Sequence, residues 1–160
     1  MNCDRTVRAS MPKPGYTLVE LIIVLAILVA LWGIAAPRYS NSICLHRCEE
    51  AARRIAADLN LARSQALMSS KSQTIAFDTT HNTYTMTGVT GLDNKSANYT
   101  VNLAADPYDC TLVSVNFNSA AKVTFDQFGS ADNSGQIIVQ CGGIQTTVTL
   151  ESSAGKATVP

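Results

Sequence analysis

The sequence lacks the short patterns by which common catalytic and metal-binding sites are recognised. None of the G-x-S-x-G, P-loop or H-E-x-x-H patterns occurs in its 160 residues. Its five cysteines include no C-x-x-C pair with adjacent histidines, and no segment resembles an EF-hand loop. The chain therefore offers no positive case for an enzyme, a cofactor or a metal site. A calcium site formed by carboxylates near the predicted turns is the alternative, and its candidate ligands are Asp106, Asp109, Asp126 and Asp132.

The chain also lacks a net charge, since 12 basic residues stand against 12 acidic ones. This balance predicts no bulk attraction to nucleic acid. The charges are unevenly placed, however, because Arg5, Arg8 and Lys13 precede a long apolar run with only Asp4 to offset them. A basic segment before an apolar run is the layout that keeps the N-terminal side of a membrane helix in the cytoplasm.

Charged residues are absent from residues 21–36, which read LIIVLAILVALWGIAA. Extended back to Tyr16, the run contains one acid, Glu20, and as a helix would be about 30 Å long, the thickness of a bilayer's hydrocarbon core. The remaining chain is too small to enclose such a helix, so we predict a membrane span over residues 16–37. A cleavable secretory signal is the alternative, with a cut after the small residues that end at Ala36.

The residues that open this run, K-P-G-Y-T-L-V-E-L at positions 13–21, resemble the leader and cleavage motif of type IV prepilins. The resemblance implies that a prepilin peptidase cuts after Gly15 and methylates the new amine of Tyr16. It also implies a set of partners, namely other pilin or pseudopilin subunits, an assembly ATPase and an inner-membrane platform. Two departures are Tyr16 in place of the commoner phenylalanine and Pro14 between Lys13 and the glycine.

Segments farther along resemble the minor pilins and pseudopilins of the GspH/FimT type. They are N-L-A-R-S-Q-A at 60–66, F-D-Q-F-G-S at 125–130 and the closing G-K-A at 155–157. Pro37 lies where pilins commonly place a helix-breaking proline. The resemblance implies a structural minor subunit of a type IV pilus or a type II secretion pseudopilus. Such a subunit is anchored in the bacterial inner membrane before assembly, with its globular domain in the periplasm, and the sequence does not separate the two machines.

A charged residue at the centre of a membrane helix costs about 2.5–3.5 kcal/mol on insertion scales, so Glu20 requires an explanation. Cleavage after Gly15 would place an amine on Tyr16, one helical turn from Glu20. We predict that the Glu20 carboxylate pairs with an amine, either its own or, as the resemblance favours, that of a neighbouring subunit. A position at the membrane–water interface, where the cost is small, is the alternative.

Beyond Pro37, which we expect to kink or interrupt the helix, the helical pattern resumes as far as residue 72. Its apolar residues recur at steps of three and four and predict an amphipathic helix packed on a sheet: Leu45, Cys48, Ala52, Ile55, Leu59, Ala62 and Ala66. The charged residues mostly fall off this stripe, and we expect them to face solvent or neighbouring subunits: Arg47, Glu49, Glu50, Arg53, Arg54, Asp58 and Arg63.

From residue 73 onward, apolar residues recur at every second position, which predicts short antiparallel strands. The expected strands are 73–78, 83–87, 99–103, 111–117, 122–128, 136–141, 145–150 and 156–159. The complete prediction is an α+β chain. It comprises a leader at 1–15, a membrane helix at 16–37, an amphipathic helix at 38–72 and a β-rich globular domain at 73–160, arranged as a sheet or sandwich.

Four cysteines would remain after loss of Cys3, in a compartment where disulfides persist. We favour a bond between Cys110 and Cys141, both in the β region, and closing this loop would contribute about 3–4 kcal/mol in the chain-entropy model. Cys44 and Cys48 lie one helical turn apart and are either two buried thiols or a second pair. Four cysteines allow three pairings, so the connectivity stays open.

The alternative to a purely structural subunit is a binding module displayed on a filament, which would contact DNA, a surface or a secreted substrate. Arg53, Arg54, Arg63 and Lys71 would supply the phosphate contacts to DNA, and such binding would be salt-sensitive. The acids interleaved with these cations favour a solvated helix face instead.

Overall fold

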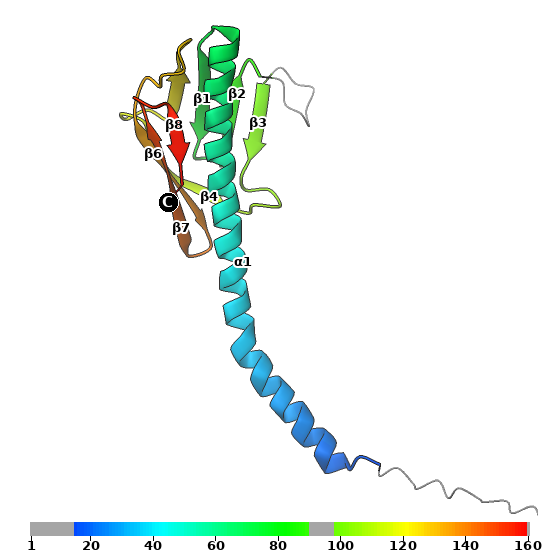
Figure 1. The fold of residues 1–160 in the computed structure, drawn as a ribbon. Helices are drawn as coiled ribbons and strands as arrows, with labels where there is room; N and C mark the ends of the chain where they lie inside the picture. The colour runs from blue at the N-terminus through cyan, green and yellow to red at the C-terminus, as the bar shows by residue number, and fades with distance from the viewer. Residues whose placement is uncertain (1–14, 90–97, 160) are drawn as a thin grey trace, which may run out of the picture. The chain divides into compact units, whose positions relative to one another are not determined.

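The computed structural model of the protein describes residues 15–89 and 98–159, with side chains for all of them except residues 34–40. The chain divides into two compact units, Met1–Tyr39 and Ser40–Pro160. One long helix, α1, runs through the boundary between the units, and the strands described all belong to the second unit (Figure 1).

The helix α1 spans Leu18–Ser69, and both of its ends have a local cause. At its start, Thr17 Oγ1 accepts the Glu20 N–H at 3.2 Å, and the Thr17 carbonyl accepts the Leu21 N–H. Thr17 is therefore the N-cap, with an acid three residues later as in a capping box. At its end, Ser70 has a φ of 51°, a left-handed conformation that stops the helix.

The backbone of α1 stays helical on both sides of Pro37. A proline removes one helical donor, which weakens the hydrogen-bond ladder at one carbonyl without forcing the chain out of the helix. The expected interruption at Pro37 is therefore wrong, while a kink at this residue stays a prediction.

The strands form two antiparallel sheets of four (Figure 1). Sheet A has the order β3-β2-β1-β5, with β1 at Gln73–Asp78, β2 at Thr83–Thr87, β3 at Asn98–Asn102 and β5 at Lys122–Phe125. Sheet B has the order β4-β6-β7-β8, with β4 at Thr111–Asn116, β6 at Gly135–Cys141, β7 at Ile144–Glu151 and β8 at Lys156–Thr158.

Each expected strand is present, and the α+β class is confirmed. The largest difference lies in β5, which ends at Phe125 instead of residue 128. The reason is Asp126, whose Oδ1 accepts the N–H groups of Phe128 and Ser130 at 2.9 and 2.8 Å and so closes a turn.

The second half of α1 packs on the inner faces of both sheets. Its small buried residues, such as Ala51 and Ala52, allow the sheets to approach the helix backbone closely. The predicted apolar stripe is buried except for Leu45, which is 42% exposed. Phe77 of β1 and Phe117, just after β4, stack with ring centroids 6.0 Å apart and so join the two sheets beneath the helix.

The favoured disulfide is present between Cys110 and Cys141, whose Cα atoms are 4.6 Å apart. It ties the start of β4 to the end of β6. Cys44 and Cys48 are free thiols, so the alternative of a second pair is not observed. Cys48 is buried, and its Sγ lies 3.4 Å from the carbonyl of Val139 and donates a weak hydrogen bond to it.

Replacing both Cys110 and Cys141 by serine should lower the free energy of unfolding by about 3–4 kcal/mol, because the disulfide closes a loop with a sequence separation of 31. Urea unfolding of the purified chain measures this loss. The matched control is Cys44→Ser, which changes a half-buried free thiol and should cost far less. Equal losses in the two variants would contradict the role of the disulfide.

Candidate functional site

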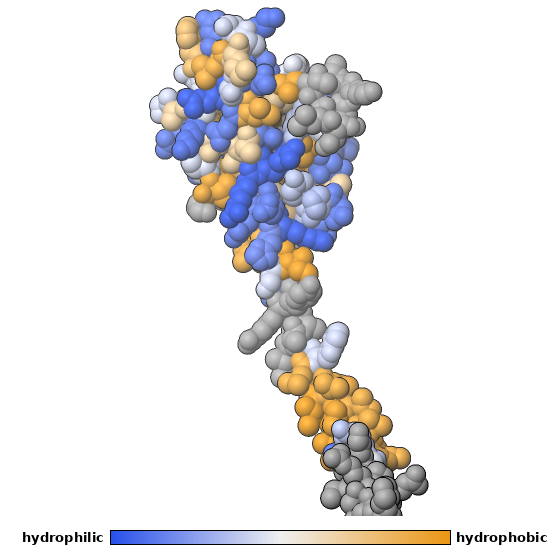
Figure 2. Space-filling model, turned by 45° about the vertical axis from the view of Figure 1, so that its right-hand side comes forward, coloured by the Kyte–Doolittle hydropathy of each residue, from blue (hydrophilic) through white to orange (hydrophobic). Residues whose placement is uncertain are grey.

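The first half of α1 exposes apolar side chains in every direction. Trp32 is 77% and Leu18 is 73% exposed, and every residue between them except Glu20 is apolar. Figure 2 shows this segment as a largely hydrophobic surface. An apolar surface of this extent is typical of a segment that contacts lipid or other protein. Among the described residues, no helix is both long enough and apolar enough to cross a membrane. The exposed set is Leu18, Val19, Leu21, Ile22, Ile23, Val24, Leu25, Ile27, Leu28, Val29, Leu31 and Trp32.

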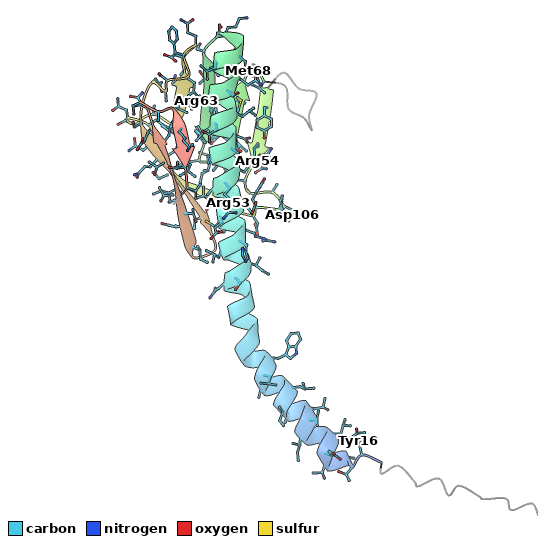
Figure 3. The ribbon with its side chains drawn as sticks, in the orientation of Figure 1. Tyr16, Arg53, Arg54, Arg63, Met68 and Asp106 are labelled. Atoms are coloured by element: carbon cyan, nitrogen blue, oxygen red, sulfur yellow. A yellow bond between two sulfur atoms is a disulfide. The ribbon has the colours of Figure 1, made fainter. Side chains whose placement is uncertain are left out.

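The three residues of the predicted processing and assembly site lie together at the start of this segment. Tyr16 is 89% exposed and directly precedes the helix cap (Figure 3). Glu20 lies exposed in the first turn, where an acid interacts favourably with the positive end of the helix dipole. No described atom lies within 4 Å of the position that a Cβ on Gly15 would take. The fold itself therefore does not require a glycine at position 15.

Sequence reasoning missed Thr17, although the pattern that identifies it is present. The T-x-x-E spacing from Thr17 to Glu20 is the signature of a capping box, and the cap orders the turn on which Glu20 lies.

A buried polar network fastens the second half of α1 to sheet A. Asp58 Oδ2 accepts the hydroxyl of Tyr84 at 2.6 Å, the hydroxyl of Tyr99 at 3.0 Å and Arg54 Nε at 3.2 Å. Arg54 also donates to the Tyr99 hydroxyl. The Asp58 side chain is only 7% exposed, so the expectation that it faces solvent is wrong. A buried carboxylate is tolerated here because three donors satisfy it.

The pKa values of these groups favour the protonation states that the network uses. Burial raises the pKa of the Tyr84 hydroxyl, and the charge of Asp58 raises it further. Burial also raises the pKa of Tyr99, although its hydrogen bond from Arg54 acts in the opposite direction. The hydrogen bond to Tyr99 is the main reason that the pKa of the Arg54 guanidinium is raised. Both hydroxyls therefore remain donors and the guanidinium remains charged.

The other flank of α1 is fastened to sheet B. Asn60 Nδ2 donates to the Ala157 carbonyl at 3.4 Å, and the Ala157 N–H donates back to Asn60 Oδ1 at 3.3 Å. Arg63 Nε donates to the Gly129 carbonyl at 3.1 Å. Gly155, with a φ of +57°, lies so close to Gly129 and Arg63 that an added Cβ would overlap the Gly129 carbonyl. The segments 60–66, 125–130 and 155–157, far apart in the sequence, thus meet at one place.

Three of the four candidate calcium ligands, Asp109, Asp126 and Asp132, are used within the fold, whereas the side chain of Asp106 has no partner among the described residues. Asp109 forms an ion pair with Arg47 at 3.0 Å, and Asp132 Oδ1 accepts the Thr124 N–H at 3.1 Å. Within residues 15–89 and 98–159, no three His, Cys, Asp or Glu side chains gather in a way that could hold a metal ion.

A long N-terminal helix, apolar and exposed over its first half and packed on antiparallel sheets over its second, is the architecture of a pilin-like subunit. The family model for type II transport protein GspH matches residues 51–155. The chain therefore belongs to the GspH family. No protein among the curated sequences matches the chain.

Two solved structures share the fold at low sequence identity. The type IV minor pilin FimU of Pseudomonas aeruginosa PAO1 has a TM-score of 0.54 and 16% identity, with 72% of this chain and 89% of that chain covered. The minor pseudopilin EpsH from the type 2 secretion system of Vibrio cholerae has a TM-score of 0.54 and 15% identity, with 71% and 96% covered.

Replacing Asp58 by alanine should lower the free energy of unfolding by about 1–3 kcal/mol, because the buried Tyr84 hydroxyl would lose its acceptor. Urea unfolding measures the change. Asp109→Ala is the matched control, since Asp109 also pairs with an arginine of α1 but its side chain is 71% exposed, and its loss should cost less than about 1 kcal/mol. A smaller loss in Asp58→Ala than in the control would refute the importance of this network.

Proposed function

We propose that this chain is a structural minor subunit of a type IV pilus or a type II secretion pseudopilus, which helps to initiate or extend the filament. The observation that carries the proposal is the combination of a GspH-family globular part with an exposed apolar helix in front of it. Neither feature forms a catalytic constellation, and we assign the chain no enzymatic activity and no cofactor.

The N-terminal segment supports processing by a prepilin peptidase. A glycine recognised by a processing enzyme fits this position, since no described atom lies within 4 Å of the place that a Cβ on Gly15 would take. In our proposal the enzyme cuts after Gly15 and methylates the amine of Tyr16. The leader carries three basic residues against one acid, so the mature chain has a more negative charge than the precursor.

In the same proposal, residues 16–37 anchor the chain in the bacterial inner membrane before assembly. The support is the sequence of the uncharged run at residues 21–36 and the exposure of its described side chains. The N-terminus would lie in the cytoplasm and the globular unit in the periplasm, where the Cys110–Cys141 disulfide is stable. The partners would be other pilin-type subunits, the prepilin peptidase and the inner-membrane assembly platform.

A DNA-binding role for the face of α1 that carries Arg53 and Arg54 is less well supported. Arg53 lies 3.4 Å from Glu49 and 3.9 Å from Glu50, and Arg54 lies 3.2 Å from Asp58. A phosphate would have to displace the chain's own carboxylates from both arginines.

The mass of the mature N-terminus tests the proposal directly. When the chain is produced in cells that contain a prepilin peptidase, mass spectrometry should detect a chain that begins with methylated Tyr16. A chain that retains Met1, or one that begins near Pro37, would contradict the assignment to the pilin class. The control is Gly15→Val in the same cells, which should block the cut while leaving the fold unchanged, because nothing described lies near that position.

Replacing Glu20 by leucine should leave the chain in the membrane fraction but reduce its incorporation into filaments roughly tenfold or more, because an amine would lose its partner in an apolar setting. Quantitative immunoblots of membranes and of sheared filaments measure the two effects. Glu50→Leu removes the same charge from the exposed face of the second half of α1 and should leave incorporation unchanged. Normal incorporation of Glu20→Leu would rule out the pairing role.

A further inference from the structure

The turn after β5 holds an aromatic side chain out into solvent. Phe128 is 72% exposed, although the backbone around it is firmly tied. Asp126 Oδ1 accepts the N–H groups of Phe128 and Ser130, the Asp126 carbonyl accepts the Gly129 N–H at 2.9 Å, and the Asp126 N–H donates to the Ser130 carbonyl at 2.9 Å. The exposure of Phe128 is therefore set by a closed network of hydrogen bonds.

This turn is also locked against the C-terminal end of α1. Gly129 has a φ of +75°, and a Cβ there would meet the Leu67 side chain at 3.0 Å. The Gly129 carbonyl accepts Arg63 Nε from the turn of α1 that precedes Leu67. Phe128 directly precedes the glycine that packs on Leu67, which is itself 46% exposed, and apolar residues are visible among hydrophilic ones at this end of the globular unit (Figure 2). Exposed apolar side chains that cluster on a rigid base mark an interaction surface better than scattered ones do.

Two cations border the same region. Arg63 and Lys156 line a groove of about 370 Å³ between α1 and β8, together with Asn60, Ser64 and Leu67. Within the part of the chain that the structure describes, neither cation has a carboxylate within ion-pair distance. Glu151 lies opposite Lys156 in the β7–β8 register but does not form an ion pair with it. Arg63 and Met68 both lie in the last turns of α1 (Figure 3).

We propose that the helix-end patch, defined as Arg63, Leu67, Phe128 and Lys156, is the docking surface for another subunit of the same filament. The inference rests on the proposed function above. The segment that docks would present a carboxylate to the groove between the two cations and an apolar side chain to Leu67 and Phe128. Charge complementarity is the reason for the acidic partner, since acids of the described chain pair with Arg47, Arg53 and Arg54 of α1 but none pairs with Arg63.

The composition and rigidity of the patch favour a protein partner over nucleic acid. Protein interfaces concentrate their binding energy in aromatic residues and arginines that lie in well-ordered surroundings. A duplex would require a broader field of cations than the two found here, because its affinity comes from many phosphate contacts. Arg63 is pre-oriented for a carboxylate, since its Nε is fixed by Gly129 and its two terminal nitrogens have no hydrogen-bond partner in the described part of the chain.

The test uses the full-length chain in its native host, with each of the other pilin-type subunits carrying an epitope tag. Phe128→Ser and Lys156→Glu should each reduce co-purification with at least one tagged subunit about tenfold, and the double variant should abolish it. The controls are Val113→Ser, an apolar side chain that is 48% exposed on β4, and Lys122→Glu at the start of β5; both should behave as wild type. Thermal unfolding of each variant checks that the exposed substitutions leave the fold intact.

A second measurement separates the charged contribution from the apolar one. Raising the salt concentration should weaken the wild-type complex more than that of Arg63→Gln, because only the wild type retains both cations.

Co-purification of Phe128→Ser and Lys156→Glu at the wild-type level would overturn the inference while leaving the proposed function standing. Failure of the wild-type chain to co-purify with any pilin-type subunit would overturn both. Salt-sensitive retention of a DNA duplex that the patch variants lose, with co-purification unchanged, would assign the patch to nucleic acid and would also overturn the inference.

Discussion

The interface between α1 and the two sheets depends on a carboxylate that would be strongly destabilising without its partners. Asp58 is buried where the helix meets sheet A, and two tyrosine hydroxyls and a guanidinium donate to a single oxygen of it. A buried charge of this kind accepts only one arrangement of its donors, because each displaced donor leaves an unpaired polar group. The network therefore fixes the rotation and the axial position of α1 on sheet A.

The opposite flank of the same helix settles where sheet B lies. Asn60, two residues after Asp58, exchanges two hydrogen bonds with Ala157 of β8 in sheet B. Arg63 reaches the turn after β5, which belongs to sheet A. The two sheets have no strand in common, so α1 and the Phe77–Phe117 contact join them. Through these contacts, segments 60–66, 125–130 and 155–157 meet near the C-terminal end of α1, where the helix-end patch lies.

The parts of this structure that depend on period and on local turn chemistry were predictable from the sequence. The β1 and β2 bounds follow from alternation on either side of a short polar turn. The Cys110–Cys141 bond was favoured because both cysteines lie in the β region, but only the structure selects it among the three possible pairings. Asp58 was not predictable, because an acid among arginines and glutamates off an apolar stripe resembles any other solvated residue. Its burial depends on Tyr84 and Tyr99, which reach it from strands that lie 26 and 41 residues away. The early end of β5 was missed for a related reason, since the side chain of Asp126 competes with the strand for backbone N–H groups.

In the proposed function, the exposed first half of α1 moves from the lipid bilayer to the apolar interior of a filament. This exchange limits the free energy that the hydrophobic effect can contribute to assembly. Lipid chains and the apolar side chains of neighbouring helices are nearly equivalent surroundings for Leu18 to Trp32, so burial in a filament gains little hydrophobic free energy. The driving force must then come from contacts that lipid cannot make. In our proposals, the pairing of Glu20 with an amine would be one such contact inside the apolar segment, and docking on the helix-end patch would be another on the globular unit. On this argument, the apolar helix is compatible with both the bilayer and the filament, and a few polar contacts make the filament the favoured state.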